Sequence, residues 1–325
     1  MIDGCIGIDI GKFKFDAAVV STHGPTKHRT FKNDLEGFKN LVAWVADDLF
    51  LFELHFCMEA TGKYGEKLAY WLHERGLKVS VVNPARIKNY GRSRLKRTKN
   101  DKADAVLIAT FCLKECPEAW RPLPAESKEL QELTRELHRV KDLLAQEKTR
   151  LKSGSDSGAV VDSIRSRITF LEAQMEVVQE QINSHIQDCP NLRKQQQLLI
   201  SIPGIGQPTA QALLAEIPDI HRFKSVRQLV AYAGLAPSER SSGTLRGQTR
   251  ISKVGSTRLR KLLYFPAVSG KRYNPVIIDF CNRLESAGKT KMVAIGAAMR
   301  KLLHIIFGVL KSERPFDAEF HLKPA

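Results

Sequence analysis

Acidic side chains at the ends of short apolar runs are the feature that most constrains how this chain can fold. Asp9 lies in an apolar run, residues 5–11, and Glu59 ends a second one. Asp101 and Asp104 stand three residues apart at the start of a helix-like stretch. A carboxylate at the tip of a buried strand is costly unless a cation or a proton compensates its charge. The pattern therefore predicts strands and a helix that converge on a divalent-cation site.

The ligand atoms of these four acids indicate which cation would bind. Oxygen ligands without histidine or cysteine suit Mg²⁺, with Mn²⁺ as the alternative. Asp101 and Asp104 share one face of a helix, as a site for one or two metal ions requires. Each acid also has a structural explanation: Asp9 as a turn acid, Glu59 as a solvent-facing strand end, and Thr98-x-x-Asp101 as a capping box. All four together, at these segment types, favour the metal site.

The order of apolar segments predicts an α/β domain over residues 1–122. A strand, a turn and a second strand occupy residues 5–20, and residues 27–31 continue the meander. Helical spacing or closure is found at residues 35–48, 66–75 and 103–115, and short buried strands at 51–59 and 78–82. A meander followed by alternating helices and strands indicates a sheet with helices packed on it. With the acids in this order, we expect a ribonuclease H-type sheet.

Residues 123–190 change to long-period helical patterning. Apolar residues recur every three or four positions from Leu130 to Leu144, and a heptad seam runs from Val161 to Ile186 after a Gly/Ser break. Two amphipathic helices joined by a flexible turn predict a helical hairpin or coiled coil. The seam fits an intramolecular hairpin and a dimerisation arm equally well.

The last segment, residues 191–325, is mainly helical with glycine-rich interruptions. The turn Pro203-Gly204-Ile205-Gly206 resembles a helix-hairpin-helix motif, in which turn amides and a helix N-terminus receive a backbone phosphate. Gly204 and Gly206 are therefore candidate DNA contacts. The alternative is a packing corner.

Charge supports a nucleic-acid partner. The chain has 51 Lys and Arg residues against 35 Asp and Glu residues, a net charge of +16. Such an excess is typical of phosphate-binding proteins, although a merely basic soluble protein has it too. A cationic run directly before the acid pair would neutralise phosphates close to the metal, unless it is a solvated loop. Its members are Arg86, Lys88, Arg92, Arg94, Lys96, Arg97, Lys99 and Lys102.

A serine-containing loop in the C-terminal segment is a candidate nucleophile site. Ser242 precedes Gly243, and Ser241 is the competing residue. A serine hydroxyl needs a base or a cation-rich site to attack a phosphate. The cations nearby in sequence are Arg240, Arg246, Arg250, Lys253 and Arg258.

The cysteines and the apolar runs indicate the compartment. The six cysteines are scattered, and no zinc-type spacing follows Cys112 and Cys116, so we expect packed, reduced thiols. No apolar run approaches the ~20 residues that span a bilayer, and no signal segment is present. These features predict a cytoplasmic protein with no membrane partner.

With these residues laid out, the chain resembles the DEDD-type insertion-sequence transposases of the IS-one-ten family, which also includes the Piv-type DNA invertases. The resemblance covers almost the whole chain. It rests on Ile-Gly-Ile-Asp9, Glu59-Ala-Thr-Gly, Asn83-Pro84, Asp101-x-x-Asp104-Ala105, Pro203-Gly204-Ile205-Gly206, and the loop Ala-Gly-Leu-x-Pro…Ser242-Gly243.

The resemblance implies a RuvC-like ribonuclease H-type domain, a coiled-coil insertion and a C-terminal transposase domain. It implies that the four acids bind Mg²⁺ and that a serine, matching Ser242, becomes covalently linked to DNA. It also implies double-stranded donor and target DNA, a structured guide RNA, and a homodimer or homotetramer. Three functions remain open: a serine-using recombinase, a RuvC-like nuclease that hydrolyses DNA junctions, and a non-catalytic nucleic-acid-binding protein.

Overall fold

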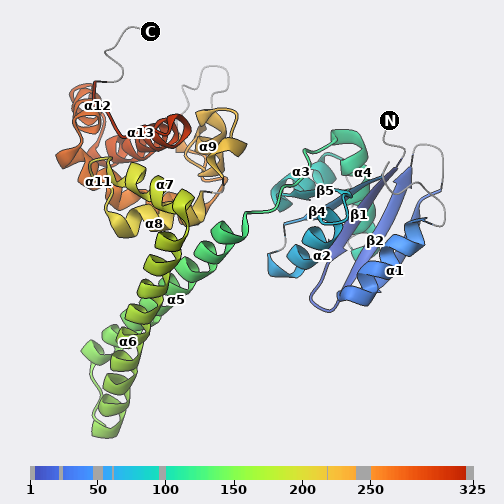
Figure 1. The fold of residues 1–325 in the computed structure, drawn as a ribbon, viewed down its shortest axis with the longest axis horizontal. Helices are drawn as coiled ribbons and strands as arrows, with labels where there is room; N and C mark the ends of the chain where they lie inside the picture. The colour runs from blue at the N-terminus through green and yellow to red at the C-terminus, as the bar shows by residue number, and fades with distance from the viewer. Residues whose placement is uncertain are drawn as a thin grey trace. The chain divides into compact units, whose positions relative to one another are not determined.

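A computed structural model describes residues 4–21, 25–46, 54–60, 62–94, 100–217, 219–238 and 250–319. The chain forms two compact units, residues 1–122 and residues 123–325 (Figure 1). Each unit encloses its own hydrophobic core.

A five-stranded mixed sheet is the centre of the first unit, and its strand order is β3-β2-β1-β4-β5. The strands β1, β2 and β3 form an antiparallel meander, and β4 and β5 extend the sheet in parallel from β1. This mixed α/β arrangement is consistent with the ribonuclease H-type sheet that the sequence predicts. The strand bounds are β1 Gly4–Ile10, β2 Lys14–Ser21, β3 Lys27–Lys32, β4 Leu54–Glu59 and β5 Lys78–Val82.

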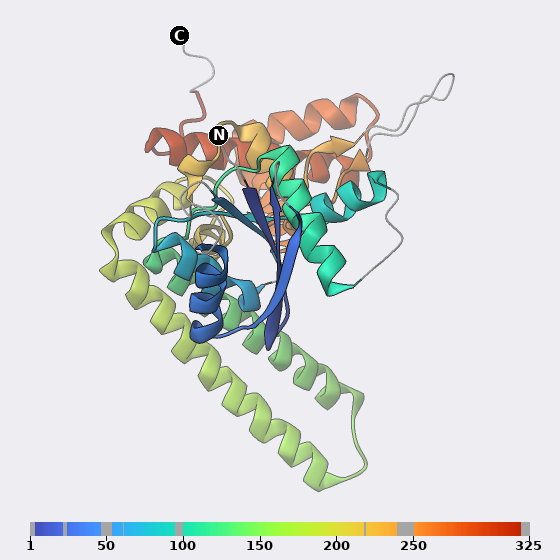
Figure 2. The same ribbon diagram turned by 90° about the vertical axis from the view of Figure 1, so that its right-hand side faces the viewer.

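Helices cover both faces of this sheet. Side chains alternate between the faces of a strand. Ile6 and Ile8 of β1 pack with α1 (Leu35–Ala46) and α2 (Lys63–His73). The intervening Cys5 packs with α3 and α4 on the opposite face. Figure 2 shows the sheet with α1 and α4 on its two sides.

The helices α3 (Pro84–Ser93) and α4 (Asp101–Glu115) begin at capped residues. The Asn83 side chain accepts a hydrogen bond from the Ala85 amide at 2.8 Å, and proline occupies the first position of α3. The apolar pattern predicts no helix there, because cations dominate the segment. The cap of α4 is Asn100, whose side chain accepts from the Ala103 amide at 2.7 Å. Asp101 is thus the first helical residue, two positions earlier than predicted.

The second unit contains a long helical hairpin joined to a cluster of shorter helices. The hairpin helices are α5 (Ala125–Ser153) and α6 (Gly158–Asp188), which run side by side (Figure 1). Leu130 of α5 and Ile186 of α6 belong to the same core as the C-terminal helices. The hairpin seam is therefore covered, at least at this end, by its own chain.

The remaining elements of the second unit surround this core. They are α7 Pro190–Ile200, α8 Gln207–Glu216, a 3₁₀ turn Ile220–Arg222, α9 Val226–Tyr232, β6 Pro237–Ser238, β7 Arg250–Ile251, α10 Thr257–Leu262, α11 Tyr264–Tyr273, α12 Pro275–Ser286 and α13 Lys291–Ser312.

The helix α13 corrects one expectation. It has 22 residues and an 18-residue window of mean hydropathy 1.7, so by length and composition it could cross a membrane. The apolar runs of the sequence predict no such segment. Half of that window is buried inside the unit. The apolar residues Ala294, Ala298 and Leu302 are completely buried in its core, and this packing accounts for the apolar composition of the helix.

Candidate active site

Asp9 and Glu59 lie side by side at the ends of two neighbouring parallel strands. The register pairs Ile8 of β1 with Met58 of β4, and each acid follows one residue later. Ile8 and Met58 are buried in the core under α1 and α2. Because side chains alternate, both acids face the side of the sheet that α4 covers. Both are half-buried.

Gly7 determines how closely α4 approaches that face. A Cβ atom at Gly7 would lie 2.1 Å from the amide nitrogen of Ala109 and 2.2 Å from the carbonyl oxygen of Ala105. Only glycine permits this contact between a helix backbone and a strand. Gly7 and Asp9 share a face of β1, so the first turn of α4, which carries Asp104, is brought to the acid end of the strand.

The electrostatics of Asp9 reflect this crowding. The pKa of Asp9 is raised from its usual range to about 6. Burial is the largest cause, and the charges of Asp104, Asp101 and Asp16 contribute the rest. Burial and the neighbouring carboxylates thus both disfavour the charged form of Asp9. A hard divalent cation would favour that form, and the oxygen donor set fits such an ion.

Asp16 is a fifth acid at this position, which the sequence analysis missed. It is the cross-strand partner of Asp9 in the β1–β2 pair and is only 4 % exposed. Thr30 donates a hydrogen bond to its carboxylate at 2.7 Å, and the His28 Nε2 atom lies 2.8 Å from the same oxygen. A charged residue in the middle of an apolar strand was the signal that could have identified it.

Lys14 connects Asp16 to α4. Its ammonium group lies 3.0 Å from an Asp101 oxygen and 3.6 Å from an Asp16 oxygen. These carboxylates raise the pKa of Lys14, the contact with Asp101 most of all. A divalent ion at the acids would therefore compete with a resident cationic side chain for Asp101.

The predicted cationic run lies partly on α3. Arg86, Lys88, Arg92 and Arg94 are exposed, whereas Ile87 and Gly91 are buried. The guanidinium of Arg86 lies over the Phe111 ring at 5.3 Å from its centroid. For Arg86, Lys88 and Arg92, the alternative to phosphate contact is therefore a charged helix face and not a solvated loop; Arg94 is the C-cap residue of the same helix. Lys96, Arg97 and Lys99 lie outside the described residues, and Lys102 is exposed on α4.

The turn between α7 and α8 packs against α11. Gly204 has a φ of +99°, and a Cβ atom there would lie 2.9 Å from the amide nitrogen of Gly270. The Asn274 side chain donates to the Pro203 carbonyl at 3.3 Å. These contacts favour the packing-corner alternative for Gly204, while Gly206, the N-cap of α8, is exposed.

The candidate nucleophile lies between two short paired strands. β6 and β7 pair Pro237 with Ile251 and Ser238 with Arg250. The connecting residues 239–249, and with them Ser241, Ser242, Arg240 and Arg246, lie outside the described residues.

The three described cations next to this loop, Arg250, Lys253 and Arg258, are exposed. The nearby guanidinium of Arg260 donates to the carbonyl oxygens of Ala233 at 3.2 Å and Lys253 at 3.4 Å. The chain on both sides of the loop is thus hydrogen-bonded to one side chain of α10.

Comparison with known proteins finds transposase families that match parts of both units. A transposase family of the DEDD type matches residues 6–155, and the family described as "Transposase IS116/IS110/IS902 family" matches residues 196–282. The chain is 40% identical over 330 residues to the "Pilin gene-inverting protein" of Moraxella lacunata and of Moraxella bovis, covering 97% of this chain and 98% of each relative.

More distant relatives carry the names of insertion sequences. The chain is 25% identical to the "Transposase for insertion sequence element IS1328" of Yersinia enterocolitica, over 79% of this chain and 81% of that protein. It is 26% identical to the "Transposase for insertion sequence element IS1111A" of Coxiella burnetii, over 58% of each. These matches define an insertion-sequence transposase or recombinase. The chain belongs to the IS110 family.

Proposed function

We propose that this protein is a DNA transposase or site-specific recombinase that cuts and rejoins DNA strands at a cation held by Asp9, Glu59, Asp101 and Asp104. The observation that carries the proposal is the convergence of the acid-bearing ends of β1 and β4 with the first turn of α4. The raised pKa of Asp9 supports a cation there, because burial and then the charges of Asp104, Asp101 and Asp16 disfavour its charged form, which a bound cation would favour. The names of the relatives, transposases and a gene-inverting protein, support DNA recombination as the activity.

The acid ligands suit Mg²⁺, with Mn²⁺ as the alternative, because all of them offer hard oxygen atoms. When bound, such an ion would stabilise the negative charge that develops on a phosphate under attack. Among the protein's own groups, Asp16 lies opposite Asp9 in the β1–β2 pair, and Lys14 forms an ion pair with Asp101. The exposed cations of α3 would hold the DNA backbone beside the acids.

We assign the attack on DNA to Ser242, with Ser241 as the lesser candidate. Its hydroxyl oxygen would lose its proton and bond to a backbone phosphorus. The bond from that phosphorus to one deoxyribose oxygen would break, and the leaving oxygen would take up a proton. The resulting phosphoserine ester conserves the energy of the broken bond. A DNA hydroxyl can therefore reverse the reaction and join a new strand without ATP. Double-stranded DNA and a structured guide RNA are the proposed partners.

The test is trapping of the covalent adduct. Labelled DNA is incubated with protein, Mg²⁺ and guide RNA, and the products are separated by denaturing electrophoresis. Ser242→Ala should lose both the adduct and strand cleavage while retaining nucleic-acid binding, which depends on Lys and Arg. Ser238→Ala, in β6 just before the loop, is the matched control and should retain both.

Two outcomes would change the assignment. An adduct that persists in Ser242→Ala and disappears in Ser241→Ala moves the nucleophile by one residue. Cleavage with free DNA ends and no adduct in any variant would identify a hydrolytic, structure-specific nuclease of the RuvC-like kind instead.

A further inference from the structure

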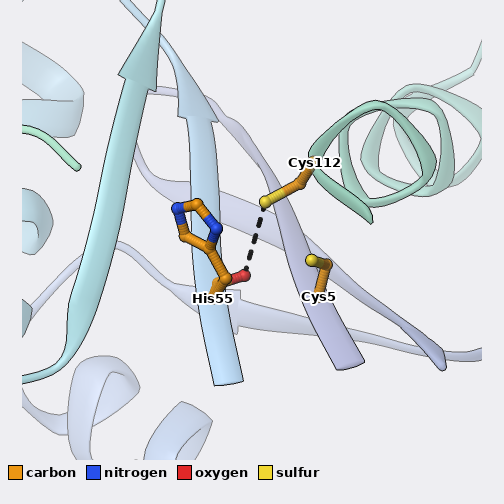
Figure 3. Close-up of side chains that lie close together, drawn as sticks. All are labelled: Cys5, His55 and Cys112. Carbon is orange, nitrogen blue, oxygen red and sulfur yellow. Dashed lines mark hydrogen bonds between the residues drawn. The ribbon is translucent and has the colours of Figure 1, made fainter. Parts of the chain in front are cut away.

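Three side chains with metal-binding atoms meet inside the first unit, on the same face of the sheet as the acids but within the core. Cys5 comes from β1, His55 from β4 and Cys112 from α4 (Figure 3). One ligand atom from each lies within 4.8 Å of the other two. The three residues are at most 1 % exposed. No sequence spacing links them, because each belongs to a different element.

The hydrogen bonds of His55 determine which of its two ring nitrogens could bind a metal ion. The Ser80 hydroxyl lies 2.6 Å from the Glu118 carbonyl oxygen and 3.1 Å from that of Pro117, and it donates its proton to one of these two carbonyls. Ser80 Oγ lies 2.8 Å from His55 Nε2 and must accept a hydrogen bond from it. We therefore assign the proton of the imidazole to Nε2. The lone pair of Nδ1 then faces the thiols, and this buried nitrogen has no hydrogen-bond partner among the residues that the structure describes.

A neutral imidazole oriented by a second hydrogen bond is the form in which histidine binds metals. Burial, and secondarily the charge of Lys78, lowers the pKa of His55 to about 4, so the ring is neutral at physiological pH. A buried acceptor without a partner costs folding free energy unless something occupies the space beside it. An ion coordinated by Nδ1 removes that cost.

We propose that Cys5, His55 and Cys112 form a structural site for a thiophilic divalent metal ion, with Zn²⁺ as the expected occupant. At Zn–S and Zn–N bond lengths of about 2.3 and 2.0 Å, tetrahedral ligand atoms lie about 3.5–3.8 Å apart. The three ligand atoms here lie within 4.8 Å of one another and would be drawn to those separations when the ion binds. Two thiolates and a neutral imidazole cancel the charge of Zn²⁺. The filled site is thus electrically neutral, as an apolar core requires.

Cys57 is the proposed fourth ligand. It is completely buried on β4 and belongs to the same core cluster as Cys5 and Cys112. As a thiolate it would add one negative charge, which the nearby ammonium of Lys78 would offset. The neighbouring thiols, Cys5 most of all, and then burial raise the pKa of Cys112, so its proton must be released when the metal binds.

The metal site would affect recombination by fixing the positions of the acid-bearing elements. Cys5 precedes Asp9 on β1, and His55 precedes Glu59 on β4, each by four residues. Cys112 lies two turns of α4 beyond Asp104. A metal bound at the three ligands would cross-link the elements that carry the catalytic acids, and would fix their separation without touching DNA.

The experiment measures metal content and ligand identity in the full-length protein, purified under reducing conditions and kept in excess Mg²⁺ so that the acids are occupied. Titration with Zn²⁺ followed by native mass spectrometry should show one zinc per chain. Co²⁺ in place of zinc should give the absorption bands of a thiolate-bound tetrahedral ion. Cys112→Ser and His55→Ala should each lose the tightly bound zinc and the tetrahedral cobalt spectrum.

Cys116→Ser and Cys281→Ser are matched controls, because both thiols lie outside the cluster, and they should retain one zinc. Circular dichroism verifies that each variant is folded, and Cys5→Ser replaces any variant that is not. A wild-type chain that takes up no zinc would overturn the proposal, leaving packed thiols. So would a folded Cys112→Ser variant that retains zinc and the cobalt spectrum.

Discussion

Asp9 and Asp16 are paired across the antiparallel strands β1 and β2, yet their surroundings differ. Asp16 is buried and receives a hydrogen bond from Thr30, with His28 beside the same oxygen. Asp9 is half-buried, and burial followed by three neighbouring acids raises its pKa to about 6. Asp16 is thus stabilised by neighbouring groups of the protein, whereas in the proposed function a cation would compensate the charge of Asp9. Such a division between neighbouring acids is typical of functional sites.

The charge of Asp9 should cost stability when no metal is present. Its pKa is about 6 in the folded chain against 3.8 unfolded, so the folded state binds the proton more tightly. Stability therefore decreases as pH rises from about 4 to about 6. In EDTA at pH 7, Asp9→Asn should be more stable than the wild type by on the order of 1 kcal/mol, after allowance for solvent screening.

Urea unfolding at pH 7 and at pH 4 measures this effect, and the difference between the two proteins should vanish at the lower pH. The same substitution should abolish recombination, because the cation loses a ligand. An Asp9→Asn chain that is no more stable at pH 7 would contradict the raised pKa.

Binding of Mg²⁺ at Asp101 and Asp104 should stabilise the folded chain. A ligand that binds only the native state raises the melting temperature. We expect Mg²⁺ to raise that of the wild type, and to leave that of Asp101→Asn/Asp104→Asn unchanged within error. Asp279→Asn, an exposed acid on α12, is the matched control and should respond as the wild type does. Normal recombination by the double variant would refute the metal-site assignment.

Most of the sheet and the four acids could be predicted from the sequence because both depend on local patterns. A short apolar run ending in an acid gives the strand and the position of Asp9 together, and the end of β5 at Val82 is marked by Asn83-Pro84. Contacts between distant segments left no such pattern. Nothing in the spacing indicates that Gly204 packs on Gly270, or that Cys5 meets Cys112. Those relationships depend on how α11 and α4 pack, which is determined by tertiary contacts.

Gly7 should also be irreplaceable because of a tertiary contact, the close approach of α4 to β1. The methyl group of Gly7→Ala would overlap the backbone of α4, with 2.1 Å to the Ala109 nitrogen. Because a helix backbone cannot yield locally, we expect a loss of about 3 kcal/mol or more of unfolding free energy, or a displaced α4. Gly158→Ala, which meets no atom within 4 Å at the start of α6, is the control and should change stability by less than about 1 kcal/mol. Denaturant unfolding of the two variants compares them directly, and equal stabilities would contradict the close contact.

The hairpin offers a test that separates its internal seam from an external one. Val178 of α6 is 8 % exposed, so Val178→Lys should lower the unfolding free energy by about 3 kcal/mol or more. Phe170 and Val177 lie seven residues apart on the same helix, and are 63 % and 50 % exposed. Apolar residues at heptad spacing form the contact face of a coiled coil between chains.

We therefore expect Phe170→Ser/Val177→Ser to retain the wild-type melting temperature and to self-associate more weakly. Sedimentation of the wild type and both variants provides the measurement. Glu176→Ser, an exposed residue adjacent to this stripe, controls for the loss of a surface side chain. If the double variant sediments with the mass of the wild type, the exposed stripe is not the contact between copies, and the homo-oligomer must form through another surface.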